Sequence, residues 1–217
     1  MNMSLAKLSP RITSMIHMDH SHVLALSRRY HPDTSPNKKL ALVTNACLAL
    51  EIHAQLEEEI FYPALRAATG ADPVLDKSVP EHNEMRQLIS RLRHLEPEDA
   101  AYDSTFMDLM RVVLHHVADE ETTLLPQTER MLGHQLRELG QQMTRRRLQL
   151  LRPHAVEVAK TTVQSFPIAS AITAVTALTA LLFGSLLVKR LIPSDSLIER
   201  PTRRLTRLTR SLRRLPT

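Results

Sequence analysis

Glycine, aromatic residues and cysteine are scarce in this 217-residue chain. It has 4 glycines, no tryptophan and 3% aromatic residues. Sheet sandwiches and barrels need turn glycines and aromatic strand residues, so this composition argues against both. The one cysteine, Cys47, excludes an intrachain disulfide and a cluster of thiolate metal ligands. Good helix formers such as Ala, Leu, Arg and Glu dominate instead, and the chain is predicted to be all-α.

The charges are distributed unevenly along the chain. Residues 1–154 carry 18 Lys and Arg against 20 Asp and Glu, whereas residues 155–217 carry 10 against 3. The basic character therefore belongs to the C-terminal segment, and no nucleic-acid partner is expected from it. Two unlike segments join near Pro153. The N-terminus lacks an apolar run of signal-peptide length, so the first segment is predicted to be cytoplasmic.

Apolar periodicity and turn residues predict four main helices and a shorter fifth one. These helices are expected at about 10–29, 37–68, 78–95, 98–131 and 134–152. Ser78 is predicted to cap the third helix with Pro80 in its first turn, and Pro63 and Pro126 to kink the second and fourth. Short loops between the first four helices favour an antiparallel four-helix bundle, which would occupy residues 1–154.

One polar pattern occurs twice in the predicted bundle. The stretches HAQLEEEIFYP (53–63) and HVADEETTLLP (116–126) both begin with His, have Glu at the fourth and fifth positions after it, and end with Pro. Similarly, DHSHVLALSRR (19–29) and EHNEMRQLISR (81–91) both begin with an acidic residue followed by His. The chain is therefore predicted to contain two copies of one helical hairpin, related by approximate two-fold symmetry.

The repeated pattern has the composition of a metal site. Residues four apart lie on one face of a helix, with Cβ atoms roughly 5–6 Å apart, and each copy places a His and a Glu in this way. The acidic-His pairs add one imidazole from each of the other two helices. Four imidazoles and two carboxylates in a bundle core suit two iron ions. The predicted metal ligands are His20, His53, Glu57, His82, His116 and Glu120.

Neighbouring residues leave alternatives to this ligand set. His115 and Asp119 form a competing pair on the fourth helix, but the offset between the repeats favours His116. His17 lies one helical turn from His20 and is an alternative ligand there.

Other polar residues near the ligands are predicted to have ordinary roles. Glu58 and Glu121 are expected to face a neighbouring helix or solvent, with contact to a ligand His as the alternative. Tyr62 and Tyr102 are predicted to pack in the core rather than to lie near the metal, and Cys47 to be a small core residue.

The two repeated motifs resemble those of the hemerythrin-like, HHE cation-binding family, whose pattern is His, then His-x-x-x-Glu, then the same again. The resemblance covers about residues 10–150. It implies a non-haem di-iron centre held by the six residues named above. Oxygen-carrying hemerythrins have a further His where this chain has Arg86, and an Asp where it has Glu121. The pattern is therefore closer to bacterial proteins of oxygen or nitric oxide response and iron handling.

The expected function is to bind or sense O2 or nitric oxide, or to handle iron. One alternative is a di-iron oxidase, reductase or iron-centre repair protein, so enzymatic activity stays open but is less favoured. A second alternative is a structural membrane adaptor with a vestigial metal site.

The C-terminal segment predicts attachment to a membrane. Residues 161–190 contain the stretch FPIASAITAVTALTALLFGSLLV (166–188), whose 23 residues would form a helix of about 34 Å, long enough to span a bilayer. Small residues along it would allow a homodimer, and a buried oligomerisation helix is the alternative. Residues 191–217 are predicted to be a basic amphipathic tail that binds anionic lipid, or a solvated one. The orientation in the membrane stays open.

Overall fold

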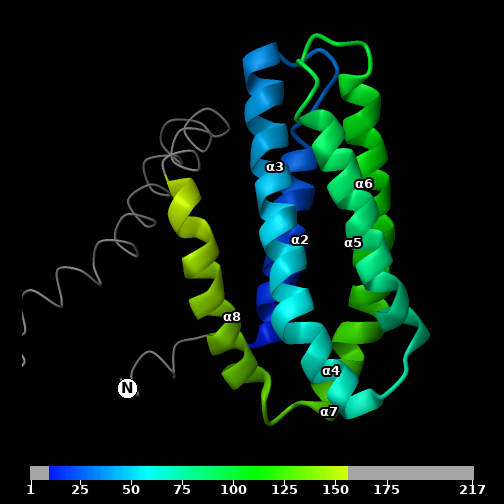
Figure 1. Cartoon of the computed structure of the whole chain (residues 1–217), viewed down its shortest axis with the longest axis vertical. Coiled ribbons are helices and arrows are strands. Elements are labelled where there is room, and N and C mark those ends of the chain that lie inside the picture. The colour runs from blue at the N-terminus through cyan, green and yellow to red at the C-terminus, as the bar shows by residue number, and fades with distance from the viewer. Residues whose placement is uncertain (1–9, 156–217) are drawn as a thin grey trace, which may run out of the picture. The chain divides into compact units, whose positions relative to one another are not determined.

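The computed structural model describes residues 10–155, which are helical apart from their turns and connecting loops (Figure 1). No strand occurs in this range, so the predicted all-α class is confirmed. The elements in chain order are α2 (Ile12–Ser27), α3 (Pro36–Leu56), η1 (Glu57–Phe61), α4 (Tyr62–Thr69), α5 (Pro73–Leu92), α6 (Tyr102–Asp119), η2 (Glu120–Leu124), α7 (Leu125–Met131), α8 (Leu136–Leu151) and η3 (Arg152–His154).

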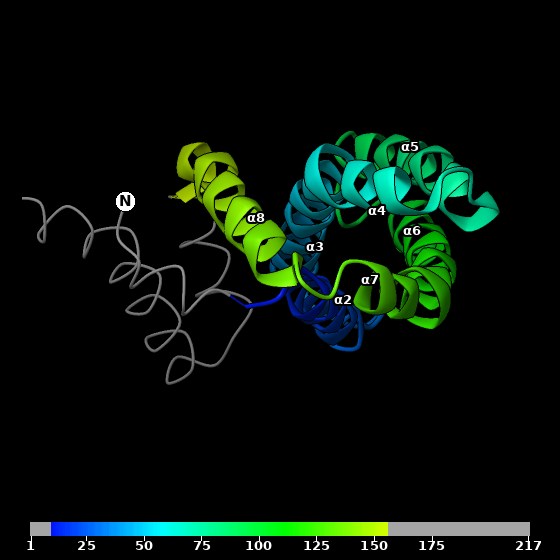
Figure 2. The ribbon, with the colours of Figure 1, turned by 90° about the horizontal axis from the view of Figure 1, so that it is seen from below.

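Four long helical segments form the bundle. Helix α2 packs against α3, and α5 packs against α6, so that each pair is one hairpin. Figure 2 shows these four helices around a common axis, with α8 outside them. Helix α8 packs against α2 and α3. Within residues 10–155, no corresponding helix covers α5 and α6, and the two hairpins therefore have different surroundings.

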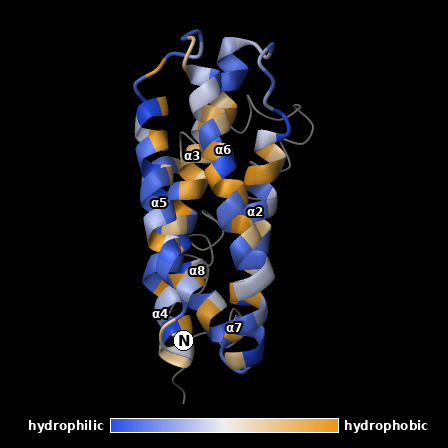
Figure 3. Ribbon diagram, turned by 90° about the vertical axis from the view of Figure 1, so that its right-hand side faces the viewer, coloured by the Kyte–Doolittle hydropathy of each residue, from blue (hydrophilic) through white to orange (hydrophobic). Residues whose placement is uncertain are grey.

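The bundle core consists of two apolar clusters separated by a polar layer. One cluster contains buried residues of all four long helices, among them Val23, Leu42 and Met85. The other includes Ile16 and Leu56, and it extends into α7 and α8. Figure 3 shows that the hydrophobic residues gather toward the inside of the bundle. Five of the six predicted ligands fall between the two clusters along the chain, and Glu57 directly follows Leu56 of the second cluster, which places all six in the middle of the bundle.

The third long helix begins earlier than the sequence predicted. Helix α5 starts at Pro73, and the side chain of Asp72 caps it by accepting hydrogen bonds from the backbone N–H groups of Val74 and Leu75. Ser78, the predicted N-cap, lies inside the helix and donates to Val74 O at 3.1 Å. Pro73 and Pro80 both fit a first helical turn, and the prediction chose the wrong one. The capping carboxylate of Asp72 explains why the earlier start is preferred.

A widened helical turn precedes each of the two prolines that were predicted to cause kinks. Segments η1 and η2 are π-helical, and the backbone N–H groups of Tyr62 and Leu125 donate to the carbonyl groups five residues earlier, at Glu57 and Glu120. Pro63 and Pro126, which come next, cannot donate a hydrogen bond, and their rings crowd the preceding turn. Each π-helical segment begins at a predicted ligand, a position typical of π-bulges at functional sites.

The predicted membrane segment lies outside the residues that the structure describes. Within residues 10–155, no helix has both the length and the apolar character needed to cross a bilayer. The predicted span at 161–190 and the basic tail at 191–217 therefore stay predictions.

Candidate metal centre

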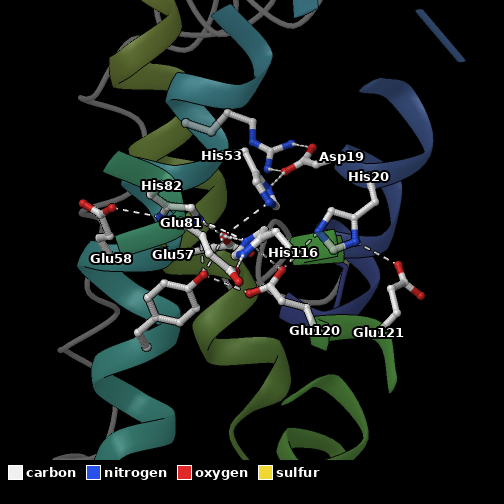
Figure 4. A network of polar contacts seen from close by, with 12 residues as sticks. Asp19, His20, His53, Glu57, Glu58, Glu81, His82, His116, Glu120 and Glu121 are labelled. Atoms are coloured by element: carbon white, nitrogen blue, oxygen red, sulfur yellow. Dashed lines mark hydrogen bonds and ion pairs between the residues drawn. The ribbon is translucent and has the colours of Figure 1, made fainter. Parts of the chain in front are cut away.

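All six predicted ligands meet in the polar layer of the bundle (Figure 4). Each of them is buried, and the most accessible, His53, is 5% exposed. Burying several ionisable groups without a strong compensating interaction is costly. The six residues are His20 on α2, His53 on α3, Glu57 at the start of η1, His82 on α5, His116 on α6 and Glu120 at the start of η2.

The six side chains form two groups with metal-binding geometry. The first contains His20, His53, Glu57 and Glu120, and the second contains Glu57, His82 and His116. In each group, one ligand atom per residue lies within 4.8 Å of all the others. Glu57 belongs to both groups, so its carboxylate is shared between them.

Imidazole nitrogens and carboxylate oxygens face one another across the first group. His20 Nε2 lies 3.2 Å from Glu120 Oε2, and His53 Nε2 lies 3.2 Å from Glu57 Oε2. Four buried polar atoms of this group have no hydrogen-bond partner, namely His20 Nε2, His53 Nε2, Glu57 Oε1 and Glu120 Oε2. Buried polar atoms are nearly always paired, and inward-facing atoms of these types are suitable donors to a cation. The residues present therefore fit a metal ion.

The second group places two imidazoles edge to face. His82 Nε2 and His116 Nε2 are 3.1 Å apart, and Glu57 Oε2 lies 3.4 Å from the first and 3.9 Å from the second. Two nitrogen lone pairs at this separation repel each other unless a proton or a cation lies between them. This group therefore also fits a cation.

The outward-facing nitrogen of each histidine predicted to be a ligand contacts a second carboxylate on the neighbouring helical segment. These contacts join His20 Nδ1 to Glu121 at 2.8 Å, His53 Nδ1 to Asp19 at 3.4 Å, His82 Nδ1 to Glu58 at 2.9 Å and His116 Nδ1 to Glu81 at 2.8 Å. An ionised carboxylate only accepts hydrogen bonds, so Nδ1 carries the proton. Nε2 of a neutral ring then directs its lone pair into the centre, as metal ligation requires.

These four carboxylates form a closed ring around the bundle. Asp19 of α2 contacts α3, Glu58 of η1 contacts α5, Glu81 of α5 contacts α6, and Glu121 of η2 contacts α2 (Figure 4). Each carboxylate is a sequence neighbour of a predicted ligand but supports the ligand of an adjoining helix. We call this set the carboxylate ring. For Glu58 and Glu121, the contact to a ligand His that the sequence left as an alternative is the observed one.

A family comparison agrees with this arrangement. The sequence model of the Hemerythrin HHE cation binding domain family matches residues 11–128. The chain belongs to this family. The match covers the four bundle helices with both candidate ligand groups, and it ends before α8.

Two relatives of the HHE domain extend the comparison. The DNA nickase of Nostoc sp. (strain PCC 7120 / SAG 25.82 / UTEX 2576) is 28% identical over 118 residues, which make up 54% of this chain and 33% of the nickase. The crystal structure of an HHE cation-binding domain-containing protein from Mycobacterium kansasii, a homologue of Rv2633c, superposes with a TM-score of 0.59 at 22% identity. It covers 72% of this chain and 99% of its own. This second likeness establishes the fold.

The histidines that competed for the ligand positions lie outside the centre of the HHE domain. His115 is exposed and contacts Glu81 and Asp119 from the surface. These three residues are near enough to hold a cation, but Lys77 already forms an ion pair with Asp119. His17 lies 2.7 Å from Glu121, behind the carboxylate that contacts His20.

Tyr62 packs in the second apolar cluster, as predicted, but its hydroxyl also reaches the candidate ligands. Its hydroxyl lies 2.9 Å from Glu120 Oε1, 3.2 Å from Glu57 Oε2 and 3.3 Å from His82 Nε2, in the centre of the site. Tyr102 is buried in the apolar cluster, as predicted. A signal that could have identified Tyr62 is its place directly before Pro63, five residues after Glu57, where its backbone N–H closes the π-turn that begins at this predicted ligand.

The buried charges shift several pKa values. Burial raises the pKa of Glu57, but the charge of His53 and the nearby imidazoles of His116 and His82 outweigh it and hold the pKa well below its usual range. Burial lowers the pKa of His116, but the charge of Glu120, the nearby carboxylate of Glu57 and the contact with Glu81 raise it to about 10. Before a cation binds, protons thus neutralise part of the negative charge.

Proposed function

We propose that the bundle holds a non-haem di-iron centre that binds or senses O2 or nitric oxide, or handles iron. The observation that carries this proposal is the pair of buried ligand groups that share Glu57. One shared carboxylate brings two cations close together, as in the di-iron carboxylate bundles.

The ligand types favour iron over other cations. The second group, Glu57, His82 and His116, has the two-histidine, one-carboxylate composition typical of non-haem iron sites with open positions. Described residues near the site add no thiolate, because Cys47 belongs to the apolar cluster. Two bound irons would supply redox-active positions for a diatomic ligand. The chain itself would orient the imidazoles through the carboxylate ring and exclude bulk water with its two apolar clusters.

A cavity of about 530 Å³ lies beside the second group and reaches Glu58, the carboxylate that contacts His82. It is lined by residues of α3, α5 and α8 and by Glu58, the carboxylate behind His82. Arg86 lies at this cavity and donates to Glu58 Oε1 at 2.7 Å. The position where oxygen carriers have a further His is thus occupied here by a side chain that supports the carboxylate ring. This difference favours sensing or iron handling over simple O2 carriage.

Metal analysis of the purified chain tests the proposal. After anaerobic loading with ferrous iron and removal of excess, about two irons per chain are expected, with visible absorption bands appearing on exposure to air. A parallel sample with Glu57→Ala is the control for surface-bound iron. An absence of bound metal in the unmodified chain would contradict the di-iron proposal and favour the adaptor with a vestigial site. Catalytic consumption of O2 with a reductant would favour the oxidase alternative.

Membrane attachment is part of the proposal and rests on the sequence of residues 166–188. The basic tail would add electrostatic attraction to anionic lipid. The 217-residue chain should sediment with membranes and resist extraction by both high salt and carbonate. Release by salt alone would show that only the basic tail binds, and a chain that needs no detergent would contradict the predicted span.

A further inference from the structure

Helix α8 reaches the metal centre through one arginine. Arg147 donates from Nη1 to Asp19 Oδ1 at 2.8 Å, and its Nη2 contacts Asp19 Oδ2. The same Asp19 Oδ2 lies 3.4 Å from His53 Nδ1, and His53 Nε2 faces Glu57 in the first ligand group. A chain of contacts therefore leads from α8 to one of the two cation positions.

The basic residue that contacts Asp19 comes from a different part of the chain than the basic residues that contact the other three members of the carboxylate ring. Arg86 on α5 donates to Glu58, His115 on α6 contacts Glu81, and His17 on α2 contacts Glu121. These three partners belong to the four bundle helices. Arg147 belongs to α8, which follows the part of the chain that matches the HHE family, residues 11–128.

The backbone of α8 is held in a definite position against the start of α2. At Gly140, a Cβ atom would lie 2.0 Å from Pro10 O, so the two backbones touch where only glycine fits. One turn further along α8, Thr144 contacts Met15 Sδ at 3.4 Å. Arg147, one more turn along, is thereby aimed at Asp19. A two-pronged guanidinium–carboxylate pair fixes the plane of the carboxylate as well as its position.

We propose that Arg147 is a positioning residue for the metal centre: through Asp19 it orients His53 and makes cation binding at His20, His53, Glu57 and Glu120 depend on the docking of α8. This inference rests on the proposed metal centre. The second group, which His82 and His116 supply, has no contact of this kind with α8 in the described residues. The two cation positions are therefore unequal, although the bundle is nearly symmetric.

A matched pair of substitutions on α8 tests this inference. Arg146 is adjacent to Arg147 and also binds a carboxylate through two nitrogens, but its partner is Glu59, which is outside the carboxylate ring. Arg147→Gln and Arg146→Gln each remove one charge and one ion pair from the same helix. The 217-residue chain is titrated with Co²⁺ without oxygen, because its visible bands report the ligands of each bound ion.

The unmodified chain is expected to bind two Co²⁺ ions. Arg147→Gln should weaken one of them by roughly 10- to 100-fold, the range for loss of a group that supports a ligand histidine, and should shift the bands of that ion alone. Arg146→Gln should leave both affinities and both sets of bands unchanged. Arg147→Lys should recover part of the affinity, because it keeps the charge but not the two-pronged geometry.

A double substitution separates positioning from general destabilisation. If Arg147 acts through Asp19, then Asp19→Asn with Arg147→Gln should weaken the ion no further than Asp19→Asn alone. Additive losses would overturn the inference, as would equal Co²⁺ affinities in Arg147→Gln and the unmodified chain while two ions still bind. Failure of the unmodified chain to bind any ion would overturn the proposed metal centre together with this inference.

Discussion

The two hairpins of the bundle contribute the same types of candidate ligand residue. The side chains and helices that surround those candidate ligands differ between the hairpins. The first comprises α2, α3, η1 and α4, and the second comprises α5, α6, η2 and α7. Each supplies two histidines, one inward glutamate, two ring carboxylates and a π-turn before a proline. The hairpins differ at Tyr62, whose repeat counterpart is Leu125, and in α8, which covers only the first. The two candidate ligand groups are therefore near-symmetric in residue type but differ in their surroundings.

The largest expected effect is a loss of cation binding, and it should differ between substitutions of the two inward glutamates, Glu57 and Glu120. Glu57→Ala should abolish binding of both cations, because both groups use this carboxylate, whereas Glu120→Ala should leave one cation on Glu57, His82 and His116. Metal content per chain after anaerobic loading measures the difference. Loss of the same number of ions from both variants would show that the two halves share the cations equally.

His116→Ala should destabilise the bundle as well as weaken the second cation. It leaves the carboxylates of Glu57, Glu81 and Glu120 without this partner, and breaking a buried charged pair costs about 3–5 kcal/mol. His115→Ala is the matched control, because its side chain is 66% exposed and surface changes cost about 0.5 kcal/mol or less. Urea unfolding with a chelator and metal titration measure both. The reverse ranking would show that the ligand on α6 is His115.

The metal-free protein should lose stability as the pH rises. His20 and His116, one from each hairpin, both have raised pKa values, and that of His116 lies at about 10 against 6.5 for an ordinary histidine. A raised pKa stabilises the fold fully below pH 6.5, and this contribution disappears as the pH rises through about 10. Cation affinity should rise over the same window, because fewer protons compete.

Unfolding by urea at several pH values between 7 and 10, with a chelator, measures this stability. Proton release on metal addition in weak buffer measures the competition. His116→Gln should flatten the stability profile, and a metal-free protein whose stability rises with pH would contradict the proposed protonation.

Tyr62→Phe should remove one difference between the hairpins, namely the hydroxyl group that Tyr62 of the first hairpin contributes to the candidate site. The hydroxyl donates to a buried carboxylate at 2.9 Å, and loss of such a hydrogen bond costs about 1.5–3 kcal/mol. Tyr102→Phe is the control, because Tyr102 is equally buried but lies in the apolar cluster. Only the first variant should alter the Co²⁺ bands. Unaltered bands in Tyr62→Phe would show that the hydroxyl turns away once cations bind.

Gly140→Ala is expected to destabilise the fold by about 1–3 kcal/mol or more, as for other overpacked contacts. The added methyl group displaces α8 from Pro10, so it should lower the melting temperature and weaken the cation held by the first group. At Gly133 the nearest atom to an added Cβ is 3.1 Å away, and Gly133→Ala should change both properties less. Equal effects of the two variants would show that α8 is not held at Gly140.

Much of the ligand chemistry could be read from the spacing of residues. His53 and Glu57, four apart on one helix, face the same way, and the second copy repeats this arrangement. Apolar periodicity and scarce glycine predicted the all-α bundle. The start of α5 was misplaced because two prolines, Pro73 and Pro80, both fit a first turn, and only the capping bonds to Asp72 distinguish them.

The sequence by itself determined which residues make up the repeated pattern of His and Glu, because helical spacing places a residue on a face regardless of its neighbours. It did not determine which helix lies next to that face. Asp19 adjoins His20 in the sequence, yet it contacts His53, and it accepts a hydrogen bond from Arg147, 128 positions away. Only tertiary packing decided these contacts, because they depend on which helices adjoin and how closely α8 approaches α2.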